Sequence, residues 1–288
     1  MHALALELGR LTNATVGFLG ESGNVLGGHA GWALPAGANA RQMFEQPRKA
    51  YLLMGIEPEF DYANPQIALA ALKQAGLVVF MSAFKNTPAL EYADVMLPIA
   101  PFTETAGTFI NIEGRVQSFN GVAKARGEAR PAWKVLRVIG NVLNFEGFEY
   151  DTSEAVRDAV VGLGKEFVSG LDNGLDGVEI SLGAVGSGAL QRIADVPINF
   201  ADPMARRSAS LKQTADSVAP TVRASEQTLL QLGLSAGDAV RVTQGSGEAL
   251  LFAKLDKNVP DGCVRVAAAH ISTVGLGDMF GQISVDRA

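Results

Sequence analysis

The sequence predicts an α/β protein: a partial doubly wound parallel sheet followed by a small C-terminal β-barrel. Residues 51–84 alternate as strand, helix and strand with short links, and a βαβ unit of this kind requires parallel strands. After residue 220, short strands recur roughly every ten residues between glycine-containing turns, as in small barrels. The 288 residues suggest about two domains at roughly 150 residues each. We therefore expect an α/β domain over 1–150, a helical or irregular connection over 151–219 and the barrel over 220–288.

The N-terminal part predicts a helix, a strand and a loop. Residues 1–12 form a helical pattern with Leu4, Leu8 and Leu11 on one side. Residues 13–19 are typical of a short strand, and a glycine-rich loop follows from Gly20 to Gly31. A helix of roughly ten to fifteen residues from Asn39 then leads to the next strand.

The clearest unit is the βαβ segment. The apolar run 50–54 predicts a strand that is covered on both faces. Asn64 and Pro65 are an N-cap and a first helical residue, and Gly76 marks the end of that helix. Residues 77–81 are the next buried strand. A short helix from Thr87 and Pro88 and a third strand over 93–99 follow, with Pro98 near a strand end or a sheet edge.

The second half begins with two helices. One opens at Pro131, and the other is capped by Asp151 with Glu154 and runs to about Val168. Residues 169–218 lack a sustained period and predict an irregular connection. Thereafter a short helix over 225–232 precedes strands over 239–243, 249–255 and 263–267, which are separated by glycine turns.

Composition excludes several functions. Twenty-four basic against 30 acidic residues give a net charge of −6, which disfavours binding to nucleic acid. A single cysteine, Cys263, excludes an internal disulfide and any all-cysteine zinc or iron–sulfur site built from this chain alone. No apolar run approaches the roughly 18–20 residues that cross a bilayer, and no secretory signal is visible. We expect an intracellular protein without direct membrane insertion.

Familiar catalytic motifs are absent from the sequence. It contains no P-loop, no dinucleotide fingerprint after the first strand and no Gly-x-Ser-x-Gly elbow. His2, His29 and His270 lie far apart without metal-ligand spacing. We predict no catalytic residue and no metal ligand in this chain.

Two polar segments allow alternative interpretations. Between Glu104 and Gln117, two glycines allow the backbone to turn tightly. Asn111 and Arg115 could either hold a polar ligand or lock the loop by hydrogen bonds from side chain to backbone. The segment 115–137 carries six basic residues against Glu128 alone. It is either a solvated face or a contact for an anion or an acidic partner.

The stretch from residue 89 to 136 resembles the molybdopterin oxidoreductase superfamily, in which the pattern ADVVLP…E…GT…N…EGR…Q is followed by G…P…W. The matching residues are Asp94, Leu97, Pro98, Glu104, Gly107, Thr108, Asn111, Glu113, Gly114, Arg115, Gln117, Pro131 and Trp133. The resemblance covers about residues 13–145. The C-terminal barrel is more loosely similar to the domain that binds the molybdopterin dinucleotide in that superfamily.

Within the superfamily, the segment looks most like the large iron–sulfur subunits of proton-pumping NADH:quinone oxidoreductases (respiratory complex I). That resemblance implies a cofactor-free scaffold, corresponding to the C-terminal part of a longer protein. The iron–sulfur clusters are then expected only in the N-terminal part that this sequence lacks. The implied partners are that cluster-bearing part and the other peripheral-arm subunits, on the cytoplasmic side of the bacterial inner membrane. Glu104, Gly107, Thr108, Asn111, Arg115 and Gln117 would form a vestigial loop beside the lost pterin.

Two other functions remain open. The chain could belong to a molybdopterin-dependent oxidoreductase of the formate dehydrogenase or nitrate reductase type, with the same loop beside a bound molybdopterin cofactor. It could also be a stand-alone small-molecule binding protein that uses the loop from Gly23 to Gly31 as an anion site at a strand end.

Overall fold

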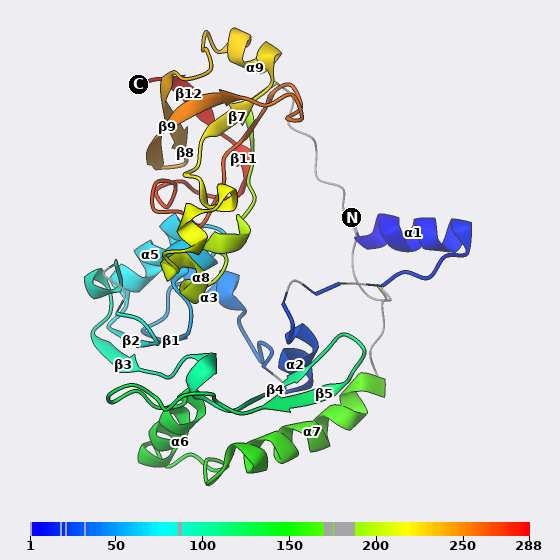
Figure 1. The fold of residues 1–288 in the computed structure, drawn as a ribbon, viewed down its shortest axis with the longest axis vertical. Helices are drawn as coiled ribbons and strands as arrows, with labels where there is room; N and C mark the ends of the chain where they lie inside the picture. The colour runs from blue at the N-terminus through cyan, green and yellow to red at the C-terminus, as the bar shows by residue number, and fades with distance from the viewer. Residues whose placement is uncertain are drawn as a thin grey trace. The chain divides into compact units, whose positions relative to one another are not determined.

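The structure is a computed structural model of the chain. It describes all residues except 1, 18, 21, 32, 86, 87, 170–174 and 176–187, and in helix α7 it describes side chains up to Val161. The chain divides into two compact units, each made of two segments. The first unit comprises Met1–Gly37 and Pro98–Ala184, and the second Ala38–Leu97 and Val185–Ala288 (Figure 1). The sequential division into 1–150, 151–219 and 220–288 stays a prediction.

The second unit contains the predicted βαβ segment. Strand β1 (Ala50–Met54) pairs in parallel with β2 (Leu77–Ser82), helix α5 (Pro65–Gln74) connects them, and β3 (Val95–Pro98) completes the order β1-β2-β3. The Asn64 side chain accepts a hydrogen bond from the backbone N–H of Ile67 at 3.3 Å, so the expected helix cap is confirmed. Strand β3 ends at Pro98 on the edge of this sheet, as expected for a residue that cannot donate to a ladder.

One face of this sheet carries the core of the α/β part. Strand residues pack there against α5 and α3 (Ala40–Glu45); the cluster includes Phe44, Tyr51, Leu53, Ala68, Ala71, Leu72, Val78 and Phe80. On the other face, Leu52, Met54 and Leu77 keep 43–48% of their surface exposed. The expectation that the strand over 50–54 is covered on both faces is therefore wrong: its burial alternates, because both helices of the cluster pack on the same side.

The N-terminal predictions are corrected in three places. Helix α1 (His2–Thr12) forms as expected. Residues 13–17 and 19 form no strand, since none of them pairs with another described strand. Part of the glycine-rich stretch is the short helix α2 (Val25–Ala30) rather than loop. Helix α3 begins after Asn39, with a complete capping box, but has only six residues. It stops there because Pro47 disfavours a helical conformation at Gln46.

The rest of the second unit is a seven-stranded sheet in the order β11-β6-β10-β7-β9-β8-β12. Its strands are β6 (Gln191–Ile193), β7 (Val222–Ala224), β8 (Ala239–Gln244), β9 (Gly247–Leu255), β10 (Cys263–Arg265), β11 (Phe280–Gln282) and β12 (Ser284–Arg287), and helix α9 (Glu226–Gln231) follows β7. Val222, Val240, Val242, Val264 and Val266 form the fully buried centre of its core. The predicted strands and Gly turns are found, whereas closure of the sheet into a barrel stays a prediction.

The predicted irregular connection over 169–218 contains more structure than expected. Strand β6 belongs to the C-terminal sheet, where it pairs in parallel with β10. Its three residues are too short to give a readable alternation in the sequence. Helix α8 (Pro203–Arg207) and the 3₁₀ turns Ile198–Phe200, Leu211–Gln213 and Ala215–Ser217 follow it. Most of the connection before residue 188 lies outside the described residues.

The first unit is organised around a β-hairpin. Strands β4 (Gly107–Ile110) and β5 (Val116–Phe119) pair antiparallel, which the sequence did not predict (Figure 1). Helices α6 (Ala132–Val142) and α7 (Ser153–Ser169) follow them, as predicted. The cap of α7 differs from the prediction: the Thr152 hydroxyl, not Asp151, accepts from the Ala155 N–H at 3.1 Å. Within the described part of the chain, no helix has the length and apolarity needed to cross a membrane.

Candidate functional site

The segment expected to form the site is the β4–β5 hairpin and its turn. Thr108 on β4 and Ser118 on β5 lie opposite each other, and their hydroxyl oxygens are 3.0 Å apart. Gly107 lies opposite Phe119, whose ring fills the space beside the glycine: a Cβ at position 107 would come within 2.8 Å of Phe119 Cε1. Gly107 is thus required by a close approach and not by a tight turn.

Asn111 closes the hairpin. Its side-chain oxygen accepts hydrogen bonds from the backbone N–H groups of Glu113 at 3.1 Å and Arg115 at 2.9 Å. Gly114 provides the positive φ, +80°, that this turn requires. The sequence left two roles open for Asn111, holding a polar ligand or locking the loop. The acceptor oxygen of its side chain locks the loop.

The other three predicted site residues do not converge on a ligand position. Glu104 accepts the backbone N–H of Arg126 at 3.0 Å and so ties two loops together. Arg115 is exposed, and its nearest carboxylate, on Glu113, is 4.0 Å away. Gln117 is exposed on β5, opposite Phe109. Of the six predicted residues, Gly107 and Thr108 line a common cavity.

That cavity, of about 460 Å³, lies within the first unit. Its walls come from the hairpin, from Trp133 on α6 and from the first two turns of α7; the main lining side chains are Thr108, Ser118, Phe119, Trp133, Glu154 and Arg157. The volume is in the range of small-molecule sites. Sequence reasoning missed the α7 residues, because their distance from the hairpin in sequence gives no sign that they meet it.

The charges around this cavity are internally satisfied. The Arg157 guanidinium pairs with Asp158, with nitrogen–oxygen distances of 2.7 and 2.8 Å. The pKa of Glu154 is lowered by a hydrogen bond from its own backbone N–H and by the Ser153 hydroxyl. Since Thr152 also takes the Ala155 N–H, two of the backbone donors at the α7 N-terminus that could attract an anion, those of Glu154 and Ala155, already have side-chain acceptors. Among the described lining residues, the walls offer hydroxyls and aromatic rings to a ligand, but no free cation.

This set of side chains does not fit a phosphate-bearing pterin cofactor. Phosphate groups in proteins are held by unpaired arginine or lysine side chains or by free backbone N–H groups. In this cavity the one guanidinium is paired and Glu154 adds a negative charge. We therefore derive no chemistry through such a cofactor here.

The loop from Gly23 to Gly31, suggested as an anion site, contains a short helix, and its anion-binding role stays a prediction. Helix α2 begins inside it, and the Asn24 side chain accepts the backbone N–H of Ile110 at 2.9 Å, which fastens the loop to β4.

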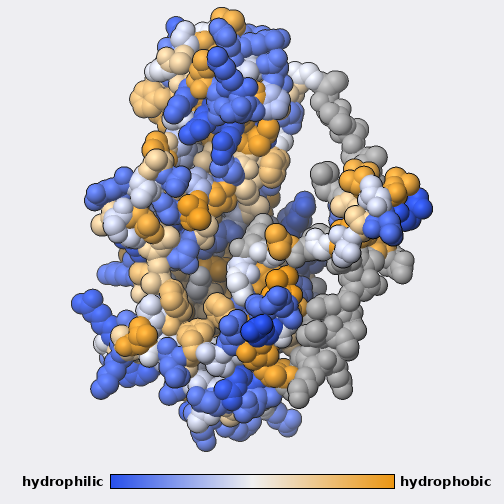
Figure 2. All heavy atoms as spheres, turned by 45° about the vertical axis from the view of Figure 1, so that its right-hand side comes forward, coloured by the Kyte–Doolittle hydropathy of each residue, from blue (hydrophilic) through white to orange (hydrophobic). Residues whose placement is uncertain are grey.

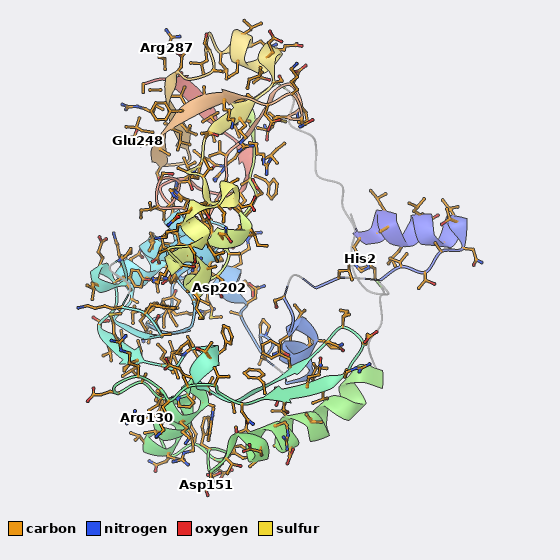
Figure 3. The ribbon with its side chains drawn as sticks, viewed as in Figure 1. His2, Arg130, Asp151, Asp202, Glu248 and Arg287 are labelled. Atoms are coloured by element: carbon orange, nitrogen blue, oxygen red, sulfur yellow. The ribbon has the colours of Figure 1, made fainter. Side chains whose placement is uncertain are left out.

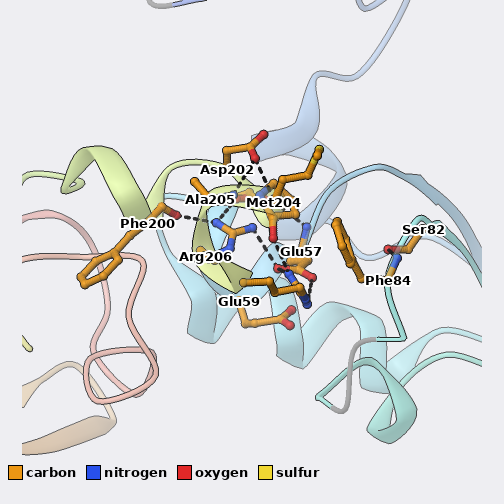
Figure 4. A network of polar contacts seen from close by, with 12 residues as sticks. Glu57, Glu59, Ser82, Phe84, Phe200, Asp202, Met204, Ala205 and Arg206 are labelled. Atoms are coloured by element: carbon orange, nitrogen blue, oxygen red, sulfur yellow. Dashed lines mark hydrogen bonds and ion pairs between the residues drawn. The ribbon is translucent and has the colours of Figure 1, made fainter. Parts of the chain in front are cut away.

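The second unit contains a buried ionic cluster that sequence reasoning missed. Glu57, which is 1% exposed, receives hydrogen bonds from the guanidinium groups of both Arg206 (2.9 Å) and Arg207 (3.2 Å) (Figure 4). Arg206 also pairs with Asp61 at 2.8 Å. The consecutive arginines after the Asp202 cap were the only signal in the sequence. Every charge of the cluster has a partner, so it fastens α8 to the α/β part and offers no group for chemistry.

Tyr92 and Glu59 lie next to this cluster. The Tyr92 hydroxyl donates to the Glu59 carboxylate at 3.0 Å, and burial, followed by the charge of Glu59, raises the pKa of Tyr92 far above its usual range. The hydroxyl therefore stays protonated at neutral pH. Among the described residues, no group of three or more His, Cys, Asp or Glu side chains could hold a metal ion.

Comparisons with known proteins show that part of the chain is similar to a known superfamily. Residues 12–142 match the family model described as molybdopterin oxidoreductase. A 70-residue stretch, 24% of this chain and 8% of the relative, is 46% identical to an NADH-quinone oxidoreductase subunit of Mycobacterium bovis. A 108-residue stretch, 38% of this chain and 12% of the relative, is 29% identical to a nitrate reductase of Shewanella frigidimarina.

A solved structure shares the fold. Acetylene hydratase from Pelobacter acetylenicus superposes with a TM-score of 0.61 at 16% sequence identity, over 87% of this chain and 47% of that enzyme. At this identity the likeness shows the fold alone. The resemblance to the superfamily is thus confirmed for residues 12–142, and the chain spans only about a tenth of the length of the two relatives that it matches in sequence.

Proposed function

We propose that this chain is a cofactor-free scaffold segment of the large iron–sulfur subunit of a proton-pumping NADH:quinone oxidoreductase, and that it supports electron transfer from NADH to quinone in the peripheral arm. The observation that carries the proposal is the 46% identity to the mycobacterial NADH-quinone oxidoreductase subunit, against 29% to the nitrate reductase. The mycobacterial match is the shorter of the two, but its identity is markedly higher.

The use of the polar side chains supports a structural role. Asn111 and Glu104 bind backbone N–H groups of the chain itself. Gly107 makes room for Phe119. Because Asn111 and Gly107 build the hairpin and Glu104 ties two loops together, these residues have a structural role that does not require a cofactor, and a lost site can persist as scaffold.

The proposal includes partners and a location. The segment would pack against the cluster-bearing N-terminal part of the large iron–sulfur polypeptide and against other peripheral-arm subunits, on the cytoplasmic side of the bacterial inner membrane. The iron–sulfur clusters would be held entirely by that N-terminal part, because Cys263 is the single thiol of this chain.

The experiment that tests the proposal measures molybdenum by elemental mass spectrometry and pterin by the fluorescence of its oxidised form, both in the purified 288-residue chain. We expect neither at more than trace level. The same chain is then co-expressed with the peripheral-arm subunits, and we expect it to co-purify with them. A stoichiometric molybdenum and pterin signal would overturn the proposal, as would a failure to associate with any of those subunits.

The second candidate is a segment of a molybdopterin-dependent oxidoreductase of the formate dehydrogenase or nitrate reductase type. The longer match, 108 residues against 70, favours it. In that case the molybdenum ligand would come from a part of the protein outside this sequence. The metal and pterin measurement distinguishes the two candidates directly.

A further inference from the structure

Helix α6 presents a row of exposed side chains that the rest of the first unit does not cover. Lys134, Val138 and Val142 recur every four residues and so share one face of the helix, while Trp133, Leu136 and Ile139 on the other faces are partly buried. Val138 is 51% exposed and Val142 73% exposed. Phe145 lies at the C-terminal end of the helix, where its N–H donates to the Gly140 carbonyl at 2.9 Å, and it adds a third apolar side chain that is 56% exposed.

Basic side chains continue this row at the start of the helix. Arg130 lies just before α6, as Figure 3 shows, and a turn in which the Ala129 N–H donates to Arg126 brings Arg126 close to it. The Arg130 guanidinium contacts two backbone carbonyls, and the Lys134 ammonium lies over the Trp133 ring at 5.3 Å. Across the described ranges of the chain, no carboxylate lies within 4.0 Å of the side-chain nitrogens of Arg126, Arg130 or Lys134.

The far end of the row has the opposite charge. Glu146 and Glu149 follow Phe145 and are exposed. We call the set Arg126, Arg130, Lys134, Val138, Val142 and Phe145 the α6 surface. It combines three cations that have no carboxylate partner among the described residues with three exposed apolar side chains, in a chain whose net charge is −6.

We propose that the α6 surface is a docking site for an acidic, amphipathic segment of a partner protein. The carboxylates of that segment would face Arg126, Arg130 and Lys134, and its apolar residues would cover Val138, Val142 and Phe145. The charge pattern argues for this occupant: the cations here have no carboxylate partners within the described residues, and an apolar row beside them favours a segment that offers both kinds of group. The docking site would exist whichever of the two candidate functions is correct.

Nucleic acid and a second copy of the chain fit this surface less well. A polyphosphate leaves the apolar row uncovered, and it meets a protein of net negative charge. A second copy could place Glu146 opposite Lys134, but three apolar side chains on each side form too small a contact for a stable dimer.

The experiment uses the full chain and a fluorescent helical peptide with glutamates in one half and leucines in the other. Its affinity is measured by anisotropy at low salt and at about 0.5 M salt, where charges are screened within a few ångströms. We expect saturable binding that weakens with salt. The same peptide with lysine in place of glutamate should bind at least about tenfold more weakly, or about 1.4 kcal/mol.

Two variants and a control localise the binding. The variant R126E/R130E should raise Kd for the acidic peptide about tenfold or more, and V138S/V142S should do the same without changing the salt dependence. The control K254E/K257E changes two exposed lysines of the second unit and should leave Kd unchanged. Circular dichroism checks that each variant is folded.

Several outcomes would overturn the inference. Equal binding of the acidic peptide by the wild-type chain and by both surface variants would show that the α6 surface is not the binding site. Tighter binding of the lysine peptide than of the glutamate peptide would show that the surface prefers a basic partner. Dimerisation of the chain that V138S/V142S abolishes would assign the surface to a second copy. Binding to anionic phospholipid vesicles in preference to the peptide would assign it to a membrane.

Discussion

Gly107 and Phe119 face each other across the β4–β5 hairpin, and the phenyl ring occupies the space that any side chain at position 107 would need. The same ring contacts Phe109 edge to face, with centroids 5.4 Å apart. The close approach of one glycine and one aromatic residue thus fixes the packing of the hairpin on which the candidate site is built.

We expect G107A to destabilise the first unit by about 1–3 kcal/mol, because the added methyl group forces the Phe119 ring aside. Chemical denaturation followed by tryptophan fluorescence measures the change. G28A, in a helical position with no atom near the added Cβ, should be neutral or slightly stabilising. If the ring is the cause, G107A should cost clearly less in an F119A background; an equal cost would refute this explanation.

Variants of Asn111 test whether its side chain locks the turn or binds a ligand. We expect N111A to destabilise the hairpin by about 1–2 kcal/mol, because two backbone N–H groups lose their acceptor. N111D retains an acceptor oxygen in the same place and should recover most of the stability, as measured by urea unfolding. Loss of stability in N111A with no recovery in N111D would show that the side-chain amide, and not only its oxygen, is needed.

Glu57 is the centre of the buried ionic cluster. In E57Q the carboxylate at this buried position becomes a neutral amide, which leaves Arg206 with Asp61 as its remaining carboxylate and Arg207 with the amide, and we expect a loss of about 3–5 kcal/mol. The matched control is E248Q, labelled in Figure 3, whose exposed pair with Arg241 at 3.4 Å should contribute less than about 1 kcal/mol. Urea unfolding of both variants measures the difference, and equal small losses would mean that the cluster does not hold α8 in place.

His270 gives the protein a pH-dependent stability. Burial lowers the pKa of this imidazole, whose Nδ1 accepts the Ser272 backbone N–H at 3.1 Å. The unfolded chain therefore binds a proton at a higher pH than the folded one, so stability is complete above the unfolded pKa of about 6.5 and falls as the pH drops below it. H270N keeps an acceptor near Nδ1 but cannot titrate, and its unfolding free energy should change less between about pH 7 and pH 5. Identical pH profiles for the two proteins would exclude His270 as the source.

Exposed apolar side chains are not confined to the α6 surface. Leu4, Leu8 and Leu11 form the apolar side of α1 that the sequence predicts, and all three are more than half exposed; Figure 2 shows apolar side chains on this helix. The face of the β1-β2-β3 sheet that carries Leu52, Met54 and Leu77 also exposes apolar side chains. Helical period and strand alternation identify which side chains share a face, but only a covering element decides whether that face is buried.

The sequence predicted the parts of the fold whose signals are local. The Asn64 cap with Pro65 located α5, and two apolar runs located β1 and β2 with their parallel pairing. It could not predict that residues 13–17 lack a strand partner or that Gln191–Ile193 would join the C-terminal sheet, because strand pairing depends on residues distant in sequence.

The candidate site likewise divides into features with local sequence signals and features set by residues distant in sequence. The sequence by itself determined that residues 104–117 carry a special backbone, since glycines and an asparagine at those spacings favour a tight turn. Only the tertiary structure decided how its side chains are used: it placed the Phe119 ring over Gly107, directed Asn111 into the turn and brought α7 with its paired Arg157 to the cavity wall. The physical reason is that backbone preference is set by neighbouring residues, whereas hydrogen-bond partners and charge compensation are set by whatever the fold brings within a few ångströms.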